Sequence, residues 1–273
     1  MANILPKDKQ VAVIGALAEC MSIRSIERLT GIHRDTIMRL GVRVGEGCAK
    51  VLDQKMRNLN STELQVDEVW GFIGKKQVNA SLSERAKGIG DVWTFLSIDA
   101  HSKIIPNFVV GKRDMYHSAM FMEDLAKRLK NRIQLSSDAM GTYADAVERA
   151  FGAEVDYGQI VKEYASPARE DQRRYSPARL VAVYKTAVVG EPMQVSTSFI
   201  ERSNLTLRLH CKRLARLTLS FSKKLENFKA AIGLNLAYYN FVKTHRSLRC
   251  TPAQEAGIEN SAWTVADLID ASN

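Results

Sequence analysis

The first sixty residues carry apolar side chains at the three- and four-residue spacing of helices that bury one face. Three such segments follow one another: Lys7–Cys20, a helix capped by Ser22, and a third that begins near His33. The turn between the second and the third contains Gly31. Three short helices with a glycine in that turn fit a helix-turn-helix, although any three-helix bundle has the same pattern.

In a helix-turn-helix, the third helix would present its first residues to the major groove of DNA. Those residues include Arg34, Thr36 and Arg39, and Arg43 extends the same exposed region by one turn. Clustered arginines favour DNA binding over a merely structural bundle. The helical pattern fades in the polar patch Asn58–Ser61, which we take as a domain boundary.

After this patch the pattern changes to short runs rich in Val, Ile, Phe and Trp, which favour strands. The first three strands are close in sequence and predict an antiparallel meander, and the later strands alternate with helices. This β-β-β-α-β-α-β-α order resembles a ribonuclease-H-like domain, a mixed sheet flanked by helices. The predicted strands are Glu63–Gly74, Val92–Ala100, Lys103–Gly111, Arg132–Ser137 and Val155–Val161, and the helices between them are Tyr116–Lys130 and Tyr143–Phe151.

The stretch Glu163–Glu191 interrupts this regularity and contains the tetrapeptide SPAR twice. We expect a basic loop there, which either touches a phosphate backbone or is a solvated surface loop. Helices at Thr197–Arg216 and Leu225–Val242 follow. The predicted organisation is an α-helical domain over residues 1–60, an α/β domain over 61–245 with the loop 163–191 inserted, and a tail over 246–273.

The distribution of charge along the chain indicates a class of binding partner. The 273-residue chain has a net charge of +9, and the segment between Arg202 and Arg249 alone holds eleven Lys and Arg against one acid, Glu226. Such a cluster neutralises phosphates and favours a nucleic-acid partner. The four cysteines are isolated, which predicts a reducing compartment without disulfides or a zinc site. We find no signal peptide or membrane-length apolar run and expect a cytoplasmic protein.

Three carboxylates stand where a sheet of this order could bring them together. Asp67 lies within the first strand, Asp138 ends the fourth, and Glu201 opens the basic helix. Converging carboxylates repel one another, and two Mg²⁺ ions would remove that cost while leaving positions for water and a substrate phosphate. Two ions can activate a water or a 3′-hydroxyl on one side of a phosphodiester and stabilise the leaving oxygen on the other.

Other acids compete with these carboxylates. Asp145 competes with Asp138, although we expect Asp145 to be an exposed helix residue. Glu68 is next to Asp67, and because strand residues alternate between faces, we expect only Asp67 to point into the site. Asp99 is a fourth acid near the metals or, as we favour, the cap of the turn that follows. His210 either assists at the site or lies on the surface of the basic helix.

The segments VDEVWGFIGKK, SSDAMGTY and IERSNLTLRLHCKRLARLTLSFSKKLE resemble those of bacterial DDE transposases of the insertion-sequence-one type. The resemblance spans about Gln65–Ile232. It implies a catalytic and metal-binding triad of Asp67, Asp138 and Glu201, served by Mg²⁺ with Mn²⁺ as a substitute. It also implies that Asn204 and Arg208 share the face of Glu201 and meet the DNA end. Lys212, Arg213 and Arg216 would extend a phosphate track.

The resemblance implies a DNA transposase that binds the ends of its element, exposes 3′-hydroxyls and joins them to target DNA by transesterification. Its partners would be double-stranded DNA, as terminal repeats and as target, and at least one more copy of the chain. Longer members of the family have a zinc finger before the helix-turn-helix, and this sequence has none. Two other functions remain open: a DNA-binding repressor with an inactive domain, and a metal-dependent nuclease or junction resolvase.

Overall fold

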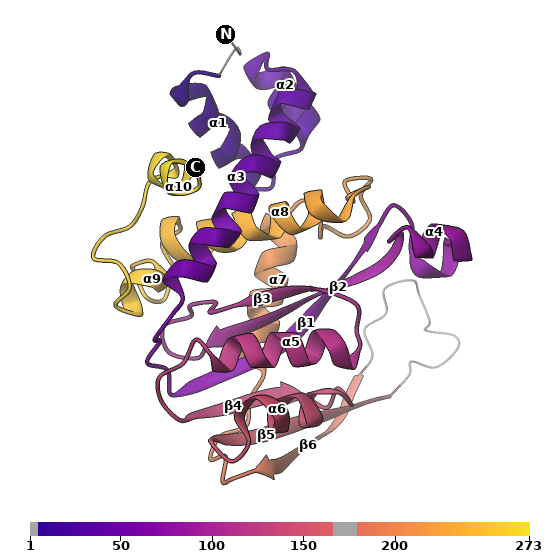
Figure 1. Ribbon diagram of the computed structural model, residues 1–273, viewed down its shortest axis with the longest axis vertical. Helices are drawn as coiled ribbons and strands as arrows, with labels where there is room; N and C mark the ends of the chain where they lie inside the picture. Colours follow the sequence, from indigo (N-terminus) through magenta and orange to yellow (C-terminus); the bar gives the residue numbers. More distant parts are fainter. Residues whose placement is uncertain (1–4, 166–178) are drawn as a thin grey trace.

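The computed structural model describes residues 5–165 and 179–273. Six strands form one mixed sheet with the order β3-β2-β1-β4-β5-β6 (Figure 1). The first three strands pair antiparallel, as predicted, while β4 runs parallel to both β1 and β5. The strands are β1 (Glu63–Ile73), β2 (Gly90–Asp99), β3 (Phe108–Gly111), β4 (Ile133–Asp138), β5 (Val155–Ala165) and β6 (Arg179–Val189).

Helices cover both faces of the sheet. On one face, α5 (Met115–Ala126) and α6 (Tyr143–Phe151) pack on Leu64 and Val66 of β1 in one core cluster. On the other face, α7 (Ser198–His210) and α8 (Leu225–Ala237) share a second cluster with Val69 and other residues of β1 and β2. Alternate residues of β1 therefore face different cores, and the predicted α/β fold with flanking helices is confirmed at this level.

The N-terminal segment forms α1 (Lys7–Ala18), α2 (Ile23–Thr30) and α3 (Arg34–Lys55). Ser22 caps α2, as predicted, because its hydroxyl accepts a hydrogen bond of 3.1 Å from the Ser25 amide. Gly31 ends α2 with a positive φ of 67°, a conformation that glycine adopts without strain.

The long helix α3 lies across α8 above the sheet (Figure 1). A β-carbon on Gly45 would lie 2.1 Å from the Ala230 carbonyl oxygen, so the two backbones nearly touch there. Residues of α3 and α8 belong to one core cluster, although the predicted domain boundary separates them in sequence. The division at residue 60 stays a prediction, and the helices on its two sides pack tightly together.

The C-terminal tail also contributes to this core. It holds the short helices α9 (Pro252–Glu255) and α10 (Val265–Ala271), which follow a π-helical turn at Tyr238–Val242. Leu268 and Ile269 of α10 are fully buried in the cluster that contains α1 and α3. None of the helices in the described residues is both long and apolar enough to cross a membrane.

Two predicted elements are wrong in part. The strand expected over Lys103–Gly111 begins only at Phe108, because Pro106 has no amide hydrogen for a ladder and Asn240 holds both backbone groups of Ile105. The loop expected over 163–191 includes strand β6, which extends a hairpin with β5. Residues 166–178, with most of both SPAR motifs, lie outside the described residues.

The connection between β1 and β2 is an ordered arm. It contains a 3₁₀ turn at Gln77–Asn79 and the helix α4 (Leu82–Ala86), and it projects beyond β1 and β2 on the right of Figure 1. Ser81 and Glu84 form a reciprocal capping box at the start of α4.

Candidate active site

Three carboxyl groups meet where β1 and β4 part. The two strands pair only from Glu63 to Gln65 of β1, and the first acid of the group, Asp67, lies two residues beyond the last pair. Asp138 is the last residue of β4. One oxygen each from Asp67, Glu68 and Asp138 lies within 4.8 Å of the others, the arrangement of a candidate metal site.

Asp67 is an incompletely neutralised carboxylate. It accepts hydrogen bonds from the Glu68 amide at 2.8 Å and from the Asn204 side-chain amide at 2.7 Å, and no salt bridge to it occurs among the described residues. Burial raises its pKa to about 7, and the negative charges of Glu68, Asp138 and Glu201 add to the rise. A cation at this point would therefore be strongly stabilised.

Glu68 lies beside Asp67 but is fully engaged by the protein. Its carboxylate accepts hydrogen bonds from the Arg113 guanidinium at 2.6 Å and from the Tyr143 hydroxyl at 2.9 Å. Burial raises its pKa, as does Asp138, while Arg113 lowers it. Tyr143 is completely buried, and burial followed by the charge of Glu68 raises its pKa well above the usual value.

The expectation that only one of these two acids can point into the site is wrong. Asp67 and Glu68 do face opposite sides of the sheet, toward α7 and α6 respectively, as strand alternation requires. Their carboxylates nevertheless come together, because the gap beside β1 is open and the longer Glu68 side chain reaches toward Asp138.

Arg113 has no sequence signal that connects it with the acids. It lies between β3 and α5, 45 residues from Glu68, and its guanidinium also lies 3.9 Å from Asp138 and 5.1 Å from the Trp93 ring centre. Only the fold brings this cation to the acidic group. Sequence reasoning therefore missed it.

Glu201, the third predicted acid, lies in the first turn of α7 but is not one of the three clustered carboxylates. It forms an ion pair with Lys162 of β5 and accepts a 2.5 Å hydrogen bond from the Thr197 hydroxyl. Its charge contributes to the raised pKa of Asp67, which means that it lies close enough to act on the cluster.

Two further predicted residues of α7 face β1 near the cluster. Asn204 donates to Asp67, and its own buried carbonyl oxygen has no hydrogen-bond partner among residues 5–165 and 179–273. Arg208 donates a hydrogen bond of 3.2 Å to the Trp70 carbonyl, and burial lowers its pKa. The shared face expected from the spacing of these residues is thus present in the structure.

The basic run after Arg208 is not a continuous helix. Helix α7 ends at His210, so Lys212, Arg213 and Arg216 lie in an irregular segment. Arg216 is exposed, whereas Arg213 is engaged by the protein through a 3.0 Å hydrogen bond to the Ser220 carbonyl. The predicted helix over Thr197–Arg216 is wrong in its last six residues.

The residues predicted to contact DNA through α3 lie at its N-terminal half, away from the carboxylates. Arg34 and Arg39 are exposed, and Thr36 is half-buried. The Arg43 guanidinium donates a 2.9 Å hydrogen bond to Gln10 of α1. Their role in DNA binding stays a prediction.

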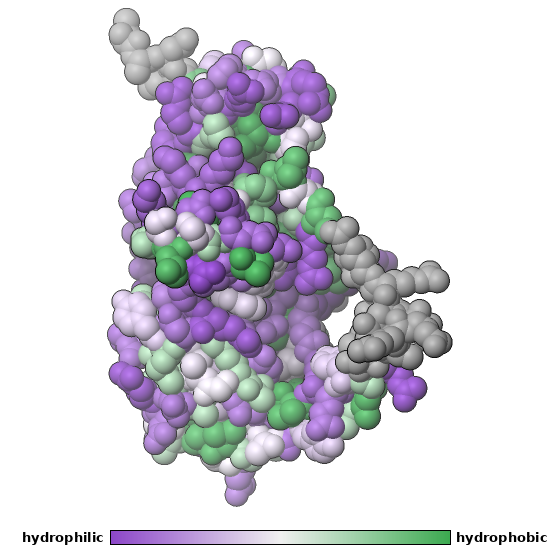
Figure 2. Space-filling view, turned by 90° about the vertical axis from the view of Figure 1, so that its right-hand side faces the viewer, coloured by the Kyte–Doolittle hydropathy of each residue, from purple (hydrophilic) through white to green (hydrophobic). Residues whose placement is uncertain are grey.

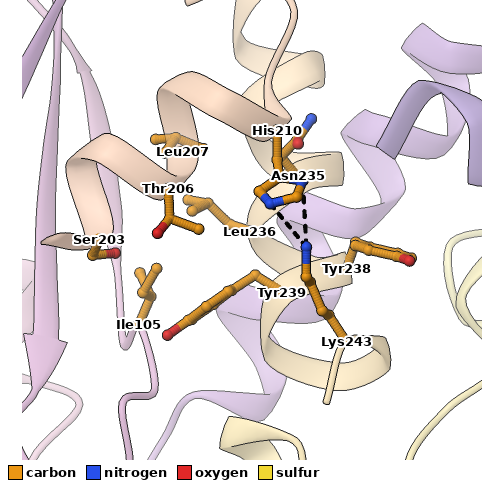
Figure 3. Close-up of a pocket in the computed structure, with 10 residues that line it drawn as sticks. All are labelled: Ile105, Ser203, Thr206, Leu207, His210, Asn235, Leu236, Tyr238, Tyr239 and Lys243. Carbon is orange, nitrogen blue, oxygen red and sulfur yellow. Dashed lines mark hydrogen bonds between the residues drawn. The ribbon is translucent and has the colours of Figure 1, made fainter. Parts of the chain in front are cut away.

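Asp99 and His210 do not join the carboxylate cluster. Asp99 caps its turn, as we favoured, by accepting hydrogen bonds from the amides of His101 and Ser102 at 2.9 and 2.6 Å. His210 lines a cavity of about 20 Å³ between α7 and the π-helical turn, where it lies 2.9 Å from the Lys243 ammonium (Figure 3). Burial lowers its pKa, and Lys243 lowers it further.

The acidic cluster fits a hard divalent cation. Its donors are carboxylate oxygens, the ligands that Mg²⁺ and Mn²⁺ take in proteins. The unpartnered Asn204 carbonyl oxygen next to Asp67 offers a position for a metal-bound water. As placed, Glu201 would have to exchange Lys162 for the cation before it could serve as a ligand.

One model of a known protein family matches part of the chain. Residues 181–242 match the family model of IS1 transposase, and this segment contains Glu201, Asn204 and Arg208. The resemblance to DDE transposases seen in the sequence is confirmed for this part of the chain. Asp67 and Asp138 lie outside the matched residues. No curated protein sequence matches the chain.

Among solved structures, the chain is similar to the piggyBac transposase in a synaptic complex with hairpin DNA. The alignment has 12% sequence identity and a TM-score of 0.42, and it covers 97% of this chain and 69% of the other. A likeness of this size carries no weight for the site.

Proposed function

We propose that the protein is a DDE transposase with a ribonuclease-H-like catalytic domain, which cleaves the ends of a DNA element and joins their 3′-hydroxyls to target DNA. One observation carries the proposal: the segment that matches the IS1 transposase model contains Glu201 and Asn204, and Asn204 holds the carboxylate of Asp67 inside a cluster of acids. The hydrogen bond from Asn204 to Asp67 thus connects the segment that matches the family model with the acidic cluster.

The carboxylates of Asp67 and Asp138 would hold divalent metal, with Glu201 as the third ligand. Bound there, Mg²⁺ supplies Lewis-acid activation of the attacking oxygen and charge stabilisation of the leaving oxygen. Asn204 orients Asp67, since its side-chain amide donates to one carboxylate oxygen while the Glu68 amide donates to the other. Arg113 and Tyr143 hold Glu68 in place beside the ligands and favour its charged form against the effect of burial.

Lys162 has a distinct task in this proposal. It neutralises Glu201 when no metal is present, and it lies on the β5–β6 hairpin that borders the site. If Glu201 served as a metal ligand, the Lys162 ammonium would lose its partner and could contact a phosphate of the DNA. Glu201 would then be paired with a cation in either state.

The helices α1–α3 act as a helix-turn-helix in this proposal, and Arg34, Thr36 and Arg39 read the terminal repeat from the N-terminal end of α3. Concerted joining of two ends requires two catalytic sites, so the active assembly is at least a dimer on DNA. The exposed Arg216 and the half-buried Lys212 contact phosphates near the site.

Glu201→Gln tests the proposal. The substrate is a duplex that carries the repeats flanking the coding region, incubated with Mg²⁺ and a target plasmid. We expect cleavage and joining to fall on the order of a thousand-fold, since losing several kcal/mol of transition-state stabilisation costs about tenfold per 1.36 kcal/mol. Binding of the duplex should be retained.

The matched control is Asp145→Asn, which removes an exposed carboxylate of α6 and should leave all activities unchanged. Full cleavage by Glu201→Gln would contradict the assignment. Binding without any cleavage by the wild type in Mg²⁺ or Mn²⁺ would instead favour the repressor function, and cleavage without joining would favour the nuclease.

A further inference from the structure

The arm between β1 and β2 is an ordered protrusion. Reciprocal hydrogen bonds join Gln77 and Asp91 at its base, with lengths of 2.9 and 3.3 Å. Arg85 donates to the carbonyls of Ala80 and Gln77, and Lys75 forms a 2.6 Å ion pair with Glu84. The arm is therefore folded by its own contacts.

This folded arm exposes two large apolar side chains. Val78 and Leu82 are each 82% accessible to solvent, although they lie in an element whose polar groups are carefully paired. They are four positions apart on the turn and the first residue of α4. An ordered element that presents apolar tips to water is a candidate for contact with another molecule.

The charge of the arm indicates which kind of molecule. Residues 75–89 contain four cations, Lys75, Lys76, Arg85 and Lys87, and one acid, Glu84, so the arm has a net charge of +3. The Lys76 ammonium lies over the Trp70 ring at 5.5 Å from its centre, and Lys87 is exposed. Cations beside an apolar wedge are the combination with which proteins enter a DNA minor groove and unstack a base step.

The position of the arm indicates which DNA. The arm is fixed to the segment after α7, since the Gly74 amide donates to the Ser222 carbonyl at 2.9 Å. In Figure 1 it lies on one side of the molecule, between α2 above and strands β4–β6 below. Figure 2 looks at that side, which is largely hydrophilic and interrupted by separate apolar patches.

A single duplex along this side would run from α3 past the arm to the carboxylates. From Asp67 to Ile73, where the arm begins, β1 rises about 20 Å at roughly 3.3 Å per residue. That length corresponds to about 6 base pairs at 3.4 Å each. The arm thus faces DNA between the cleavage point and the sequence that α3 would read.

We propose that the β1–β2 arm binds the duplex of the element's own end, about 6 base pairs from the scissile phosphate, and bends it by inserting Val78 and Leu82 into the minor groove while Lys76 and Lys87 contact the flanking phosphates. This inference rests on the proposed function and adds to it a specific DNA contact and a deformation.

The test uses the full-length protein and an end duplex without target DNA, with a fluorophore pair on either side of the predicted bend. Val78→Ser/Leu82→Ser should abolish the bend and lower affinity about tenfold, with the salt dependence of binding unchanged. Lys76→Gln/Lys87→Gln should reduce the slope of log K against log salt by about 2, since each phosphate contact contributes roughly 0.9. Hydroxyl-radical footprinting should lose protection at the predicted position in the serine variant.

Met193→Ser is the matched control, because this apolar side chain is 95% accessible and lies outside the arm. All substituted side chains are exposed, and thermal unfolding should confirm that each variant is folded. Wild-type bending of the end duplex by the serine variant overturns the proposal. In a second reaction that includes a target plasmid, a defect of this variant confined to joining also overturns it, because the arm would then belong to target DNA. Failure of the wild-type protein to bind or cleave end DNA, measured in a parallel reaction, would instead refute the proposed function itself.

Discussion

Asp67 and Glu68 are neighbours on one strand, yet their surroundings differ in kind. Glu68 has a guanidinium and a buried hydroxyl on its two oxygens, so its charge is compensated by the protein. Asp67 accepts from two amides and pairs with no cation in the described part of the chain, and burial raises its pKa to about 7. A carboxylate whose charge is compensated by a cation of the protein has a structural role. A buried carboxylate without such a partner can bind a ligand cation.

The largest expected effect is on catalysis. Asp67→Asn should lower Mg²⁺-dependent cleavage of end DNA on the order of a thousand-fold, because it removes a charged metal ligand but keeps the shape of the side chain. Single-turnover cleavage in Mg²⁺ and in Mn²⁺ measures it. Cleavage within threefold of wild type would mean that Asp67 is no more a ligand than Glu68.

The pH dependence of stability gives the next effect. Between pH 3.8, the ordinary pKa, and about 7, folded Asp67 binds a proton that the unfolded chain releases. The contribution of this group to stability therefore falls as the pH rises toward 7 and is lowest above it. Without metal, Asp67→Asn should be more stable than wild type at pH 8, by up to about 3 kcal/mol, and equal near pH 4.

Urea unfolding in the presence of a chelator measures this difference. Asp145→Asn, with its exposed carboxylate, should show no pH-dependent gain. A constant difference between Asp67→Asn and wild type from pH 4 to 8 would show that Asp67 is already compensated in the folded protein.

Glu68 should behave in the opposite way. Glu68→Ala removes the partner of Arg113 and leaves the buried Tyr143 hydroxyl without an acceptor, so we expect a loss of about 2 kcal/mol in unfolding free energy. Arg113 is partly exposed, which limits the cost of its lost partner. If neither Glu68→Ala nor Tyr143→Phe lowers the free energy of unfolding in urea, the hydrogen bonds of Glu68 do not contribute to stability.

The smallest effect concerns Lys162. Its ion pair with Glu201 joins two partly exposed side chains, and such pairs contribute about 0 to 1 kcal/mol. Lys162→Met should change the melting temperature little but weaken binding of end DNA, measured at two salt concentrations. A large loss of stability with unchanged DNA binding would make Lys162 a structural residue.

Most of the sheet could be predicted from local patterns. Strands β1, β2, β4 and β5 carry the apolar runs that define them, and α2 has its serine cap in sequence. Strand β6 was missed because its valines follow an arginine-rich stretch that resembles a loop. The length of β3 depended on a contact between Ile105 and Asn240, which are 135 residues apart.

The site was predictable where one motif contained both partners. Asn204 and Arg208 follow Glu201 at helical spacing, so their common face could be inferred. The closeness of Glu68 to Asp138 could not, because it depends on where β1 and β4 stop pairing. The pair of Lys162 with Glu201 and the approach of Arg113 are likewise products of tertiary structure, with no local signal.

The near contact of Gly45 with Ala230 fixes where α3 crosses α8. With 22 residues, α3 is about 33 Å long at 1.5 Å per residue, close to one turn of B-DNA. The crossing with α8 leaves no room for a side chain at Gly45, so α3 packs directly on the backbone of α8. In the proposed function, cleavage then depends on the helical phase between the recognised sequence and the cut. Adding about 5 base pairs would place the scissile phosphate on the opposite side of the duplex. Adding a full turn of about 10 base pairs would return it to the same side and only increase the distance.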